Sequence, residues 1–359
     1  MNAYTWLMAA VLILALLLRG DRPRNKSYIA ACFFVMFVVM GMRDITTVGN
    51  DSNSIYRRMF MECGALPYSQ VGAYFDRESI AYFYFMRLLY DLTGGDYQMA
   101  YMIFSIAVLI PLGRFVYKYS PNPVQSIVYY WGLILFGNHF DTMRQGLAMA
   151  LLLLAFDGIV EEKPLRFLLL TLMGYLFHPP ALIFIAAYPL SRMKTNGGYL
   201  IFLACLLAFT YHFREQILEL MLDFYDTTIY DYDMSFLSNK ALIMLVIVLA
   251  GLVLRPPEET DRVYGILMQF MGIAIVIQTF ASYNNTFERL SNYFFQFSIV
   301  FIPMVFQTDS RRSRLLDIKT EAMGKQLAPW VFGAFGVWRF LNTMSNSYGT
   351  WLPYRFFFE

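Results

Sequence analysis

Ionisable side chains gather at the ends of apolar stretches of this sequence. In GMRDITTVGNDSNSIYRR, residues 41–58, Arg43, Asp44 and Asp51 follow an apolar run long enough to enter a membrane. Burying an uncompensated charge is costly, so charged groups at such positions are usually retained for a ligand or a partner. Arginine binds anions, whereas carboxylates and histidine take up protons. The same mixture recurs at Glu78, His139, Asp141, Arg144, His178, Glu288 and Arg289.

The elements expected to position these residues are membrane-spanning helices. With 58% hydrophobic, 18% aromatic and 15% charged residues over 359 positions, the chain is too apolar for a soluble protein. The first apolar run, WLMAAVLILALLL, has no positive segment before it and no small-residue cleavage site after it. We therefore expect a retained transmembrane helix rather than a signal peptide. Cys32, Cys63 and Cys205 are scattered and predict neither a disulfide framework nor a metal site.

The apolar segments predict an all-α, polytopic membrane protein with about 12 transmembrane helices in one integral domain, residues 1–359. The expected spans are 3–18, 27–42, 97–113, 124–139, 143–160, 165–178, 180–191, 198–212, 239–254, 263–281, 290–306 and 328–342. Basic residues concentrate in the short connectors, and the positive-inside rule places these connectors in the cytoplasm. They are Arg19, Arg22, Arg24, Lys26, Arg114, Lys118, Lys163, Arg166, Arg192, Lys194, Arg255, Arg262, Arg311, Arg312, Arg314, Lys319 and Lys325. Strict alternation then places both termini outside.

One further apolar stretch, SIAYFYFMRLLYDL at 79–92, is expected to lie along the outer membrane surface. Counting it as a span would place Arg114 and Lys118 outside, and Arg87 in its middle would be costly at bilayer depth. An amphipathic or re-entrant helix avoids both problems. Two larger outer segments result, 43–96 and 213–238. The second combines carboxylates with aromatic rings, which suits sugar binding, a lid over a lipid-substrate groove, or simply a solvated amphipathic helix.

Several stretches, in this order, resemble the EpsG-like branch of the Wzy polysaccharide polymerases. They are MRDITTVGNDSNSIY, RESIAYFYFMRLL, MRQGLAMALLLLAF, YLFHPPALIFIAAYPL and FERLSNYFFQFSIVFIP. The resemblance covers most of the chain and implies a multi-pass protein of the bacterial inner membrane with a GT-C-like architecture. It also implies polymerisation of lipid-linked oligosaccharide repeat units on the outer face. The FHPP turn departs from the Phe-His-Ser that is more usual in such proteins, although the histidine, His178, is kept.

The implied reaction moves a growing glycan from a polyprenyl pyrophosphate carrier to a sugar hydroxyl on the next lipid-linked unit. The pyrophosphate leaving group needs cations, and arginine pairs bidentately with phosphate oxygens at any working pH. Arg43, Arg144 and Arg289 are the expected ligands, and we favour Arg144 and Arg289 because both stand at outer ends of spans. No DxD motif or acidic pair with metal-ligand spacing stands out on this face, so we expect transfer without a metal or another cofactor.

The acceptor hydroxyl needs a general base, and the candidates, in order of preference, are His178, Asp51 and Glu78. The residues expected to contact the glycan are Asp141, His139, Glu288 and Tyr293. The expected partners are polyprenyl-pyrophosphate-linked oligosaccharide as donor and acceptor, membrane lipid and a chain-length regulator protein. A basic patch and a Gly-rich phosphate loop are absent from the sequence, which argues against nucleic acid as a partner.

The sequence leaves a structural interpretation open for each candidate. Arg43 and Asp44 can form an interfacial ion pair that anchors a helix end, and Asp51 can cap the helix that follows it. The remaining candidates can be helix anchors, turn residues or packed core residues: His139, Asp141, Arg144, His178 and Arg289.

Other functions also stay open. A membrane glycosyltransferase that adds one sugar, or a ligase for a finished glycan, would share the outer arginines, and product length would separate either from a polymerase. A transporter or flippase would place its charges near the midplane of broken helices. A scaffold without enzymatic activity has no reason to gather arginine, histidine and carboxylate groups on one side.

Overall fold

The computed structural model describes residues 3–18, 26–75, 78–193, 197–217, 219, 238–254, 262–281, 285–307, 318–347 and 351–359. Within these residues the chain is 83% helical and has no strand, which confirms the all-α prediction. An isolated β-bridge joins Arg43 to Phe356. The chain groups into two compact units, residues 1–182 with 327–359 and residues 183–326, which we call unit 1 and unit 2. The prediction of one integral domain stays a prediction.

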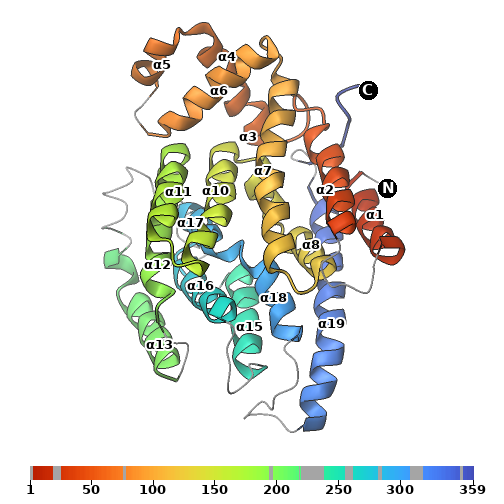
Figure 1. The fold of residues 1–359 in the computed structure, drawn as a ribbon, viewed down its shortest axis with the longest axis vertical. Helices are drawn as coiled ribbons and strands as arrows, with labels where there is room; N and C mark the ends of the chain where they lie inside the picture. Colours follow the sequence, from red (N-terminus) through yellow and green to blue (C-terminus); the bar gives the residue numbers. More distant parts are fainter. Residues whose placement is uncertain are drawn as a thin grey trace. The chain divides into compact units, whose positions relative to one another are not determined.

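Unit 1 contains the helices from α1 to α11 and most of α19 (Figure 1). Their bounds are α1 Ala3–Leu18, α2 Lys26–Gly41, α3 Asn50–Asn53, α4 Ile55–Ala65, α5 Tyr68–Tyr74, α6 Ile80–Thr93, α7 Tyr97–Tyr119, α8 Pro123–Gly132, α9 Leu135–Phe140, α10 Met143–Val160, α11 Pro164–Phe177 and α19 Ile318–Ser345. Unit 2 contains the second half of the 3-10 helix η1 Pro179–Ala186 and the helices α12 Ala187–Leu190, α13 Gly197–His212, α15 Asn239–Val253, α16 Arg262–Gln278, α17 Asn285–Phe295 and α18 Ser298–Gln307.

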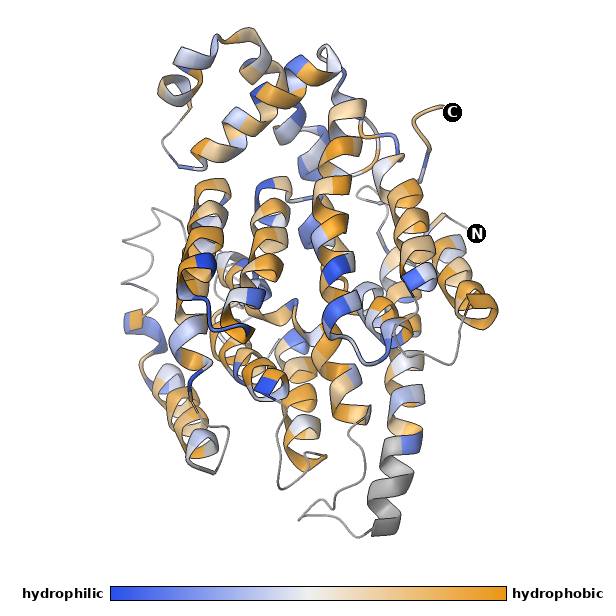
Figure 2. Cartoon of the chain, viewed as in Figure 1, coloured by the Kyte–Doolittle hydropathy of each residue, from blue (hydrophilic) through white to orange (hydrophobic). Residues whose placement is uncertain are grey.

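Most predicted spans coincide with observed helices. The ranges 3–18 and 143–160 match α1 and α10 residue for residue. The ranges 27–42 and 165–178 are shifted by one residue from α2 and α11, and 239–254 ends one residue beyond α15. Figure 2 shows mostly hydrophobic residues along α7, α10 and α11. Among the described residues, Tyr97–Tyr119 and Met143–Val160 are both long and apolar enough to cross a membrane, and the other apolar helices are shorter. The count of about 12 spans and the GT-C-like architecture therefore stay predictions.

Some predicted spans are not continuous α-helices. The range 124–139 is divided into α8 and α9 at Ile134, whose φ of 60° lies in the left-handed region. The range 290–306 is divided into α17 and α18 by a turn at Gln296 and Phe297. The range 180–191 forms η1 and the short helix α12. This segment begins with Pro179 and Pro180, whose nitrogens cannot donate the hydrogen bonds of an α-helix.

The helices α7 and α10 form the core of unit 1. α7 packs against α2, α6 and α10, and α10 lies between α7 and α11. Phe156 of α10 contacts Phe115 and Tyr119 of α7 with ring centroids 5.7 and 5.0 Å apart. At the other end of α10, Gly146 permits close approach of α9, because a Cβ there would clash with the carbonyl oxygen of His139. α10 is therefore packed closely against neighbouring helices near both of its ends, against α7 at one end and α9 at the other.

The helices α4, α5 and α6 form a layer over one end of unit 1, which we call the α6 end. α6 packs against α4, α5, α7 and α11. Its residue Arg87 donates from Nε to the carbonyl oxygen of Leu66 at 2.9 Å and forms an ion pair with Asp91 one turn later. The guanidinium also lies over the ring of Tyr68, 4.9 Å from its centroid. The helix expected at 79–92 thus exists, and its charge is satisfied within this layer. Its position at a membrane surface stays a prediction.

The helix α16 is the centre of unit 2, where it packs against α13, α15, α17 and α18. Phe184 of η1 stacks nearly parallel on Phe297 at 5.5 Å and contacts Phe270 and Phe294 at 5.5 and 5.3 Å. These rings form the aromatic core of the unit. The predicted second outer segment, 213–238, lies mostly outside the described residues, which include only 213–217, 219 and 238 of it.

Candidate functional site

Most of the predicted site residues belong to unit 1. Unit 1 holds Arg43, Asp51, Glu78, His139, Asp141, Arg144 and His178, whereas unit 2 holds Glu288, Arg289 and Tyr293.

Arg43 is fully buried at the α6 end of unit 1, with 0% of its surface exposed. Its Nη2 donates to Ser52 Oγ at 3.1 Å, to the Tyr101 hydroxyl at 2.7 Å and to the carbonyl oxygen of Phe140 at 3.1 Å. The guanidinium also stacks on the ring of Trp351, 4.7 Å from its centroid. A single side chain therefore ties the end of α2 to α3, α7, α9 and the C-terminal tail.

Asp44 does not pair with Arg43. Its carboxylate accepts hydrogen bonds from the amide and hydroxyl of Thr46, at 2.9 and 2.6 Å, and from the hydroxyl of Thr47 at 2.9 Å. Partial burial raises the pKa of Asp44, but these hydrogen bonds outweigh it and the net pKa is lowered. The interfacial ion pair that the sequence left open is wrong, because Arg43 turns inward while Asp44 closes its own turn.

Asp141 is held by the segment that contains Arg43. Its Oδ1 accepts from the hydroxyl of Ser52 at 3.1 Å and from its amide at 3.4 Å. Since Ser52 Oγ also accepts from Arg43, one chain of hydrogen bonds runs from the arginine to the carboxylate, which we call the Arg43–Ser52–Asp141 network. Gly49 lies against it with φ of 102°, and a Cβ there would clash with Ser52 Oγ. Asp141 therefore does more than satisfy its own turn.

Asp51 and His139 lie beside this network. The short helix α3 begins at Asn50 after Gly49 and has no side-chain cap, so the expectation that Asp51 caps a following helix is wrong. Asp51 instead lies half-buried in the first turn of α3. His139 is buried, with Nδ1 3.1 Å from the carbonyl oxygen of Leu135 and its ring 5.6 Å from the ring of Tyr130.

Arg144 is the half-buried cation of the α6 end. It lies in the first turn of α10, and its guanidinium carbon is 6.0 Å from the ring centroid of Tyr56. That ring contacts Tyr82 of α6 at 5.6 Å, and the Tyr82 hydroxyl is 3.9 Å from the sulfur of Met143. Arg144 forms none of the ion pairs found among the described residues, and its enclosed Nε has no hydrogen-bond acceptor there. The protein therefore leaves guanidinium donors of Arg144 available to a ligand.

His178 lies half-buried at the end of α11, where its amide donates to the carbonyl oxygen of Gly174 at 2.9 Å. The preceding residue, Phe177, contacts Phe85 of α6 with ring centroids 6.0 Å apart. Because α6 contacts the first turn of α10 through Tyr82 and the end of α11 through Phe85, it lies over the helix ends that carry Arg144 and His178. Glu78 is exposed, just before the start of α6.

In unit 2, the sequence analysis missed Lys240. Its Nζ donates to Glu288 Oε1 at 2.9 Å and to Asn292 Oδ1 at 2.6 Å, so it ties the start of α15 to α17. Arg289 lies on the exposed side of α17, and Tyr293 is fully buried. The signal was present in the sequence as a lysine two residues after Ser238, the residue that caps α15 by accepting from the amide of Ala241.

Among the described residues no group of three or more His, Cys, Asp or Glu side chains is arranged to hold a metal ion. Within the same residues the three cysteines are free, with Cys32 and Cys63 buried and Cys205 exposed.

The comparisons with known proteins give one match. A family model described as the EpsG family matches residues 28–356. The match includes every predicted site residue in both units. No curated protein and no solved structure matches the chain.

Proposed function

From the membership of this chain in the EpsG family, a family of Wzy-type polysaccharide polymerases found in membranes, we propose that it polymerises lipid-linked oligosaccharide repeat units. The donor is the growing glycan on polyprenyl pyrophosphate, and the acceptor is a sugar hydroxyl on the next lipid-linked unit. One structural observation carries the proposal beyond the family: Arg144 presents guanidinium donors at the end of a core helix without a carboxylate partner among the described residues.

The proposed reaction breaks the bond between the anomeric carbon of the donor and the pyrophosphate oxygen. A new bond forms from that carbon to the acceptor oxygen, and the acceptor proton goes to a base. Negative charge develops on the departing pyrophosphate, where Arg144 stabilises it by charge-assisted hydrogen bonds. The same role for Arg289 stays a prediction from the sequence. Thr142 gives α10 no side-chain cap, and the positive end of the helix dipole lies near Arg144. In this proposal arginine takes the place that a divalent cation holds in other transferases.

Arg43 receives a supporting role in the proposal. Its complete burial and three hydrogen bonds favour an anchor for the 43–58 segment rather than a group that meets substrate first. Its Nε and Nη1 have no hydrogen-bond acceptor among the described residues, so the prediction that it also binds pyrophosphate is kept. That contact requires Trp351 to move off the guanidinium.

We assign the general base to His178, because it is half-buried at a helix end that α6 covers together with Arg144. Asp51 stays the second choice, and the exposed Glu78 is the third. Glycan contacts by Asp141 and Glu288 stay predictions, as do contacts by His139 and Tyr293. The last two are fully buried, so a local opening must precede their contact with a sugar.

The proposed orientation places the α6 end outside the bacterial inner membrane. The opposite end of α7 and α10 supports it, because basic residues of two predicted cytoplasmic connectors come together there: Arg114, Lys118, Lys163 and Arg166. A chain-length regulator as partner stays a prediction.

The test is complementation of cells that lack the native gene, with surface polysaccharide resolved by length on a gel. The wild-type chain is compared at matched membrane levels with Arg144→Ala, Arg144→Lys and the control Arg58→Ala, whose side chain is 71% exposed and pairs only loosely with Glu62 at 3.8 Å. We expect long ladders from the wild type and the control, and single repeat units from Arg144→Ala. Arg144→Lys keeps the charge but loses the planar fork, so it should give short ladders.

Two outcomes would overturn the proposal in different ways. Long chains in Arg144→Ala would make Arg144 a structural anchor and remove it from the site. If the wild-type chain supports only single additions to purified lipid-linked acceptor, the single-addition transferase or ligase becomes the better reading. A change in lipid-linked oligosaccharide export without any change in length would instead favour a flippase.

A further inference from the structure

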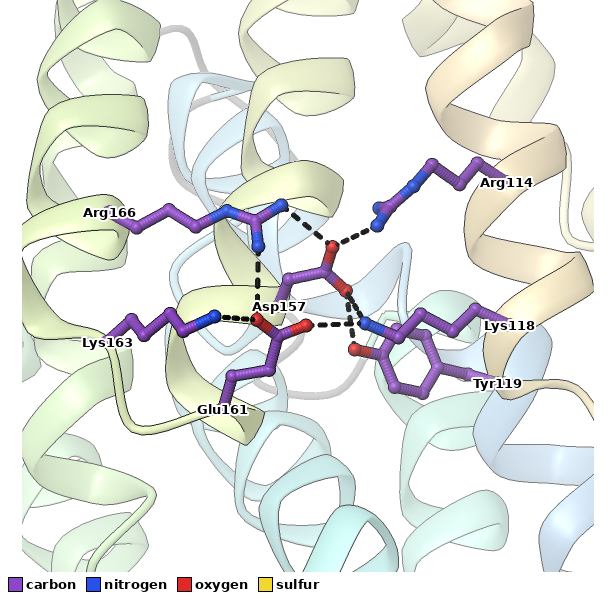
Figure 3. Close-up of polar contacts among 7 residues, drawn as sticks. All are labelled: Arg114, Lys118, Tyr119, Asp157, Glu161, Lys163 and Arg166. Carbon is purple, nitrogen blue, oxygen red and sulfur yellow. Dashed lines mark hydrogen bonds and ion pairs between the residues drawn. The ribbon is translucent and has the colours of Figure 1, made fainter.

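At the end of unit 1 opposite the α6 end, a buried aspartate of α10 accepts hydrogen bonds from side chains of α7 and α11 (Figure 3). Asp157 of α10 has no exposed side-chain surface. Its Oδ1 accepts from Lys118 at 2.8 Å and from the Tyr119 hydroxyl at 2.6 Å, while Oδ2 accepts from Arg114 at 2.5 Å and Arg166 at 3.1 Å. The carboxylate is therefore saturated by groups from both helices that flank α10.

A second carboxylate completes the cluster. Glu161 accepts from Lys118 at 2.8 Å, from Lys163 at 3.0 Å and from Arg166 at 3.2 Å. We call the six charged residues the Asp157 cluster: Arg114, Lys118, Asp157, Glu161, Lys163 and Arg166. It holds four cations and two carboxylates, so its own charge is +2.

The cations of the cluster are open to an outside ligand, unlike its aspartate. The side chains of Arg114, Lys118 and Arg166 are 41%, 34% and 38% exposed, and that of Lys163 is 62% exposed. Arg114, Lys118 and Arg166 each donate to Asp157 and still keep part of their side-chain surface exposed. A site with excess positive charge and free donors favours an anion with several acceptor oxygens.

Apolar surface adjoins these cations on both flanking helices. On α7, one exposed stripe runs through Ile103, Ile106 and Ile110 and continues directly into Arg114, at the spacing of a single helix face. On α11, an exposed face begins beside Arg166 with Leu165, Leu169 and Leu172. Cations at the end of apolar stripes match the two parts of a lipid, a charged head group and hydrocarbon chains.

We propose that the Asp157 cluster binds the phosphodiester head group of an anionic glycerophospholipid. The acyl chains of this lipid lie along the exposed isoleucines of α7 and leucines of α11. Asp157 is a positioning residue. Its ion pairs hold Arg114 and Lys118 of α7 and Arg166 of α11 close to α10, so that these cations can contact the same phosphate. The charge of the cluster selects this occupant over a zwitterionic lipid, because a phosphatidylcholine head group brings its own cation.

The test is native mass spectrometry of the purified full-length protein with equal amounts of phosphatidylglycerol and phosphatidylcholine that carry identical acyl chains. The variant is Arg114→Gln/Lys163→Gln, which leaves Asp157 its bonds from Lys118, Tyr119 and Arg166. The matched control is Arg57→Gln/Arg58→Gln, which removes two exposed cations of α4. If the double variant fails to fold, Lys163→Gln alone replaces it, since that side chain is the most exposed of the four.

We expect the wild type and the control to retain phosphatidylglycerol preferentially. The variant should bind it about fivefold more weakly for each cation removed, and its preference over phosphatidylcholine should fall accordingly. Equal preference in the variant and the wild type would overturn the proposal, as would an equal loss in the control. A competition arm adds glycerol phosphate at the lipid concentration. The lipid should stay bound, and its displacement would show that the cluster takes soluble phosphate esters instead.

Discussion

Ser52 and Asp141 lie 89 positions apart in the sequence and are joined by a hydrogen bond of 3.1 Å from the serine hydroxyl to Oδ1. The same hydroxyl oxygen accepts from Nη2 of Arg43, also at 3.1 Å. A buried hydroxyl thus relays between a cation and a carboxylate, and it locks the 43–58 segment against α9. Arg43, at the end of α2, thus helps to hold the 43–58 segment in place through the Arg43–Ser52–Asp141 network.

Replacement of Ser52 by alanine should destabilise the protein. The hydroxyl is fully buried, and its loss removes one of three acceptors of Arg43 Nη2 and the shorter of two hydrogen bonds to Asp141 Oδ1, at a cost of about 1–3 kcal/mol. The measurement is thermal unfolding of the purified protein in detergent. The control is Ser54→Ala, because Ser54 is exposed and bonds only to the carbonyl oxygen of Asn50 in its own turn. Equal melting temperatures for the two variants would mean that the network adds no stability.

Gly49→Ala should destabilise the protein more than Gly94→Ala, a replacement that adds only backbone strain. Gly49 and Gly94 both have positive φ, 102° and 61°, so alanine is strained at either position. At Gly49 the new Cβ would also clash with Ser52 Oγ and lie 3.0 Å from Asp141, whereas at Gly94 it meets nothing within 4 Å. We expect Gly49→Ala to melt at a lower temperature than Gly94→Ala and to shorten the polysaccharide ladder. A Gly94→Ala protein that is equally impaired would argue that strain alone decides the loss.

The helices could be predicted from the sequence far better than their breaks. The ends of α1 and α10 were predicted correctly from apolar runs bounded by turn residues. Both signals are local, because a continuous apolar segment and the turn residues that end it can be recognised in the sequence alone. The interruptions at Ile134 and Gln296 have no such local signature. Ile134 is as apolar as its neighbours and has no intrinsic preference for φ of 60°, so packing against other helices imposes the break.

In the candidate site, too, the positions of charged residues could be predicted but their partners could not. The sequence shows which charged residues stand at helix ends, and Arg43, Asp141 and Arg144 all lie at the α6 end of unit 1. Their partners could not be predicted, since Arg43 hydrogen-bonds to a group 97 positions away and stacks on Trp351 of the C-terminal tail, and only tertiary packing brings these groups together. Lys240 was overlooked because a single lysine at the start of an apolar run resembles an ordinary snorkelling anchor.

Glu161 of the Asp157 cluster should make the folded protein less stable as the pH falls into the acidic range. Hydrogen bonds from Lys118 and Lys163 lower the pKa of Glu161 from 4.5 to about 2. Because the folded state lowers this pKa, the contribution is complete above about pH 4.5 and disappears as the pH falls through about 2. We expect the melting temperature of Glu161→Gln to approach that of the wild type across this window. A constant difference between the two proteins from pH 5 to pH 2 would contradict the assignment.

Removal of divalent cations should leave polymerisation intact. In the proposed reaction the Arg144 guanidinium stabilises the pyrophosphate, so no metal ion is needed at that position. The measurement is product length from purified enzyme and lipid-linked repeat units after dialysis against EDTA. Unchanged ladders are expected. Loss of product that Mg²⁺ restores would place a cation in the site and reduce the arginines to positioning groups.

Lys240 should act through Glu288. Lys240 is mostly buried and bonds to both Glu288 and Asn292, whereas Glu288 is 44% exposed and needs this bond to hold its carboxylate in one place. A double-mutant cycle with Lys240→Met and Glu288→Gln should give a coupling of about 0.5–1 kcal/mol in thermal unfolding, within the range for partly exposed pairs.

The same cycle should be read in product length, where either single variant shortens the ladder and the double variant shortens it no further. The control cycle pairs Lys240→Met with Glu215→Gln, because Glu215 interacts with Arg214 instead. Its two effects should simply add. If the Lys240 and Glu288 effects also add in product length, the lysine contributes independently of Glu288, and its proposed role as a positioning residue for that carboxylate is wrong.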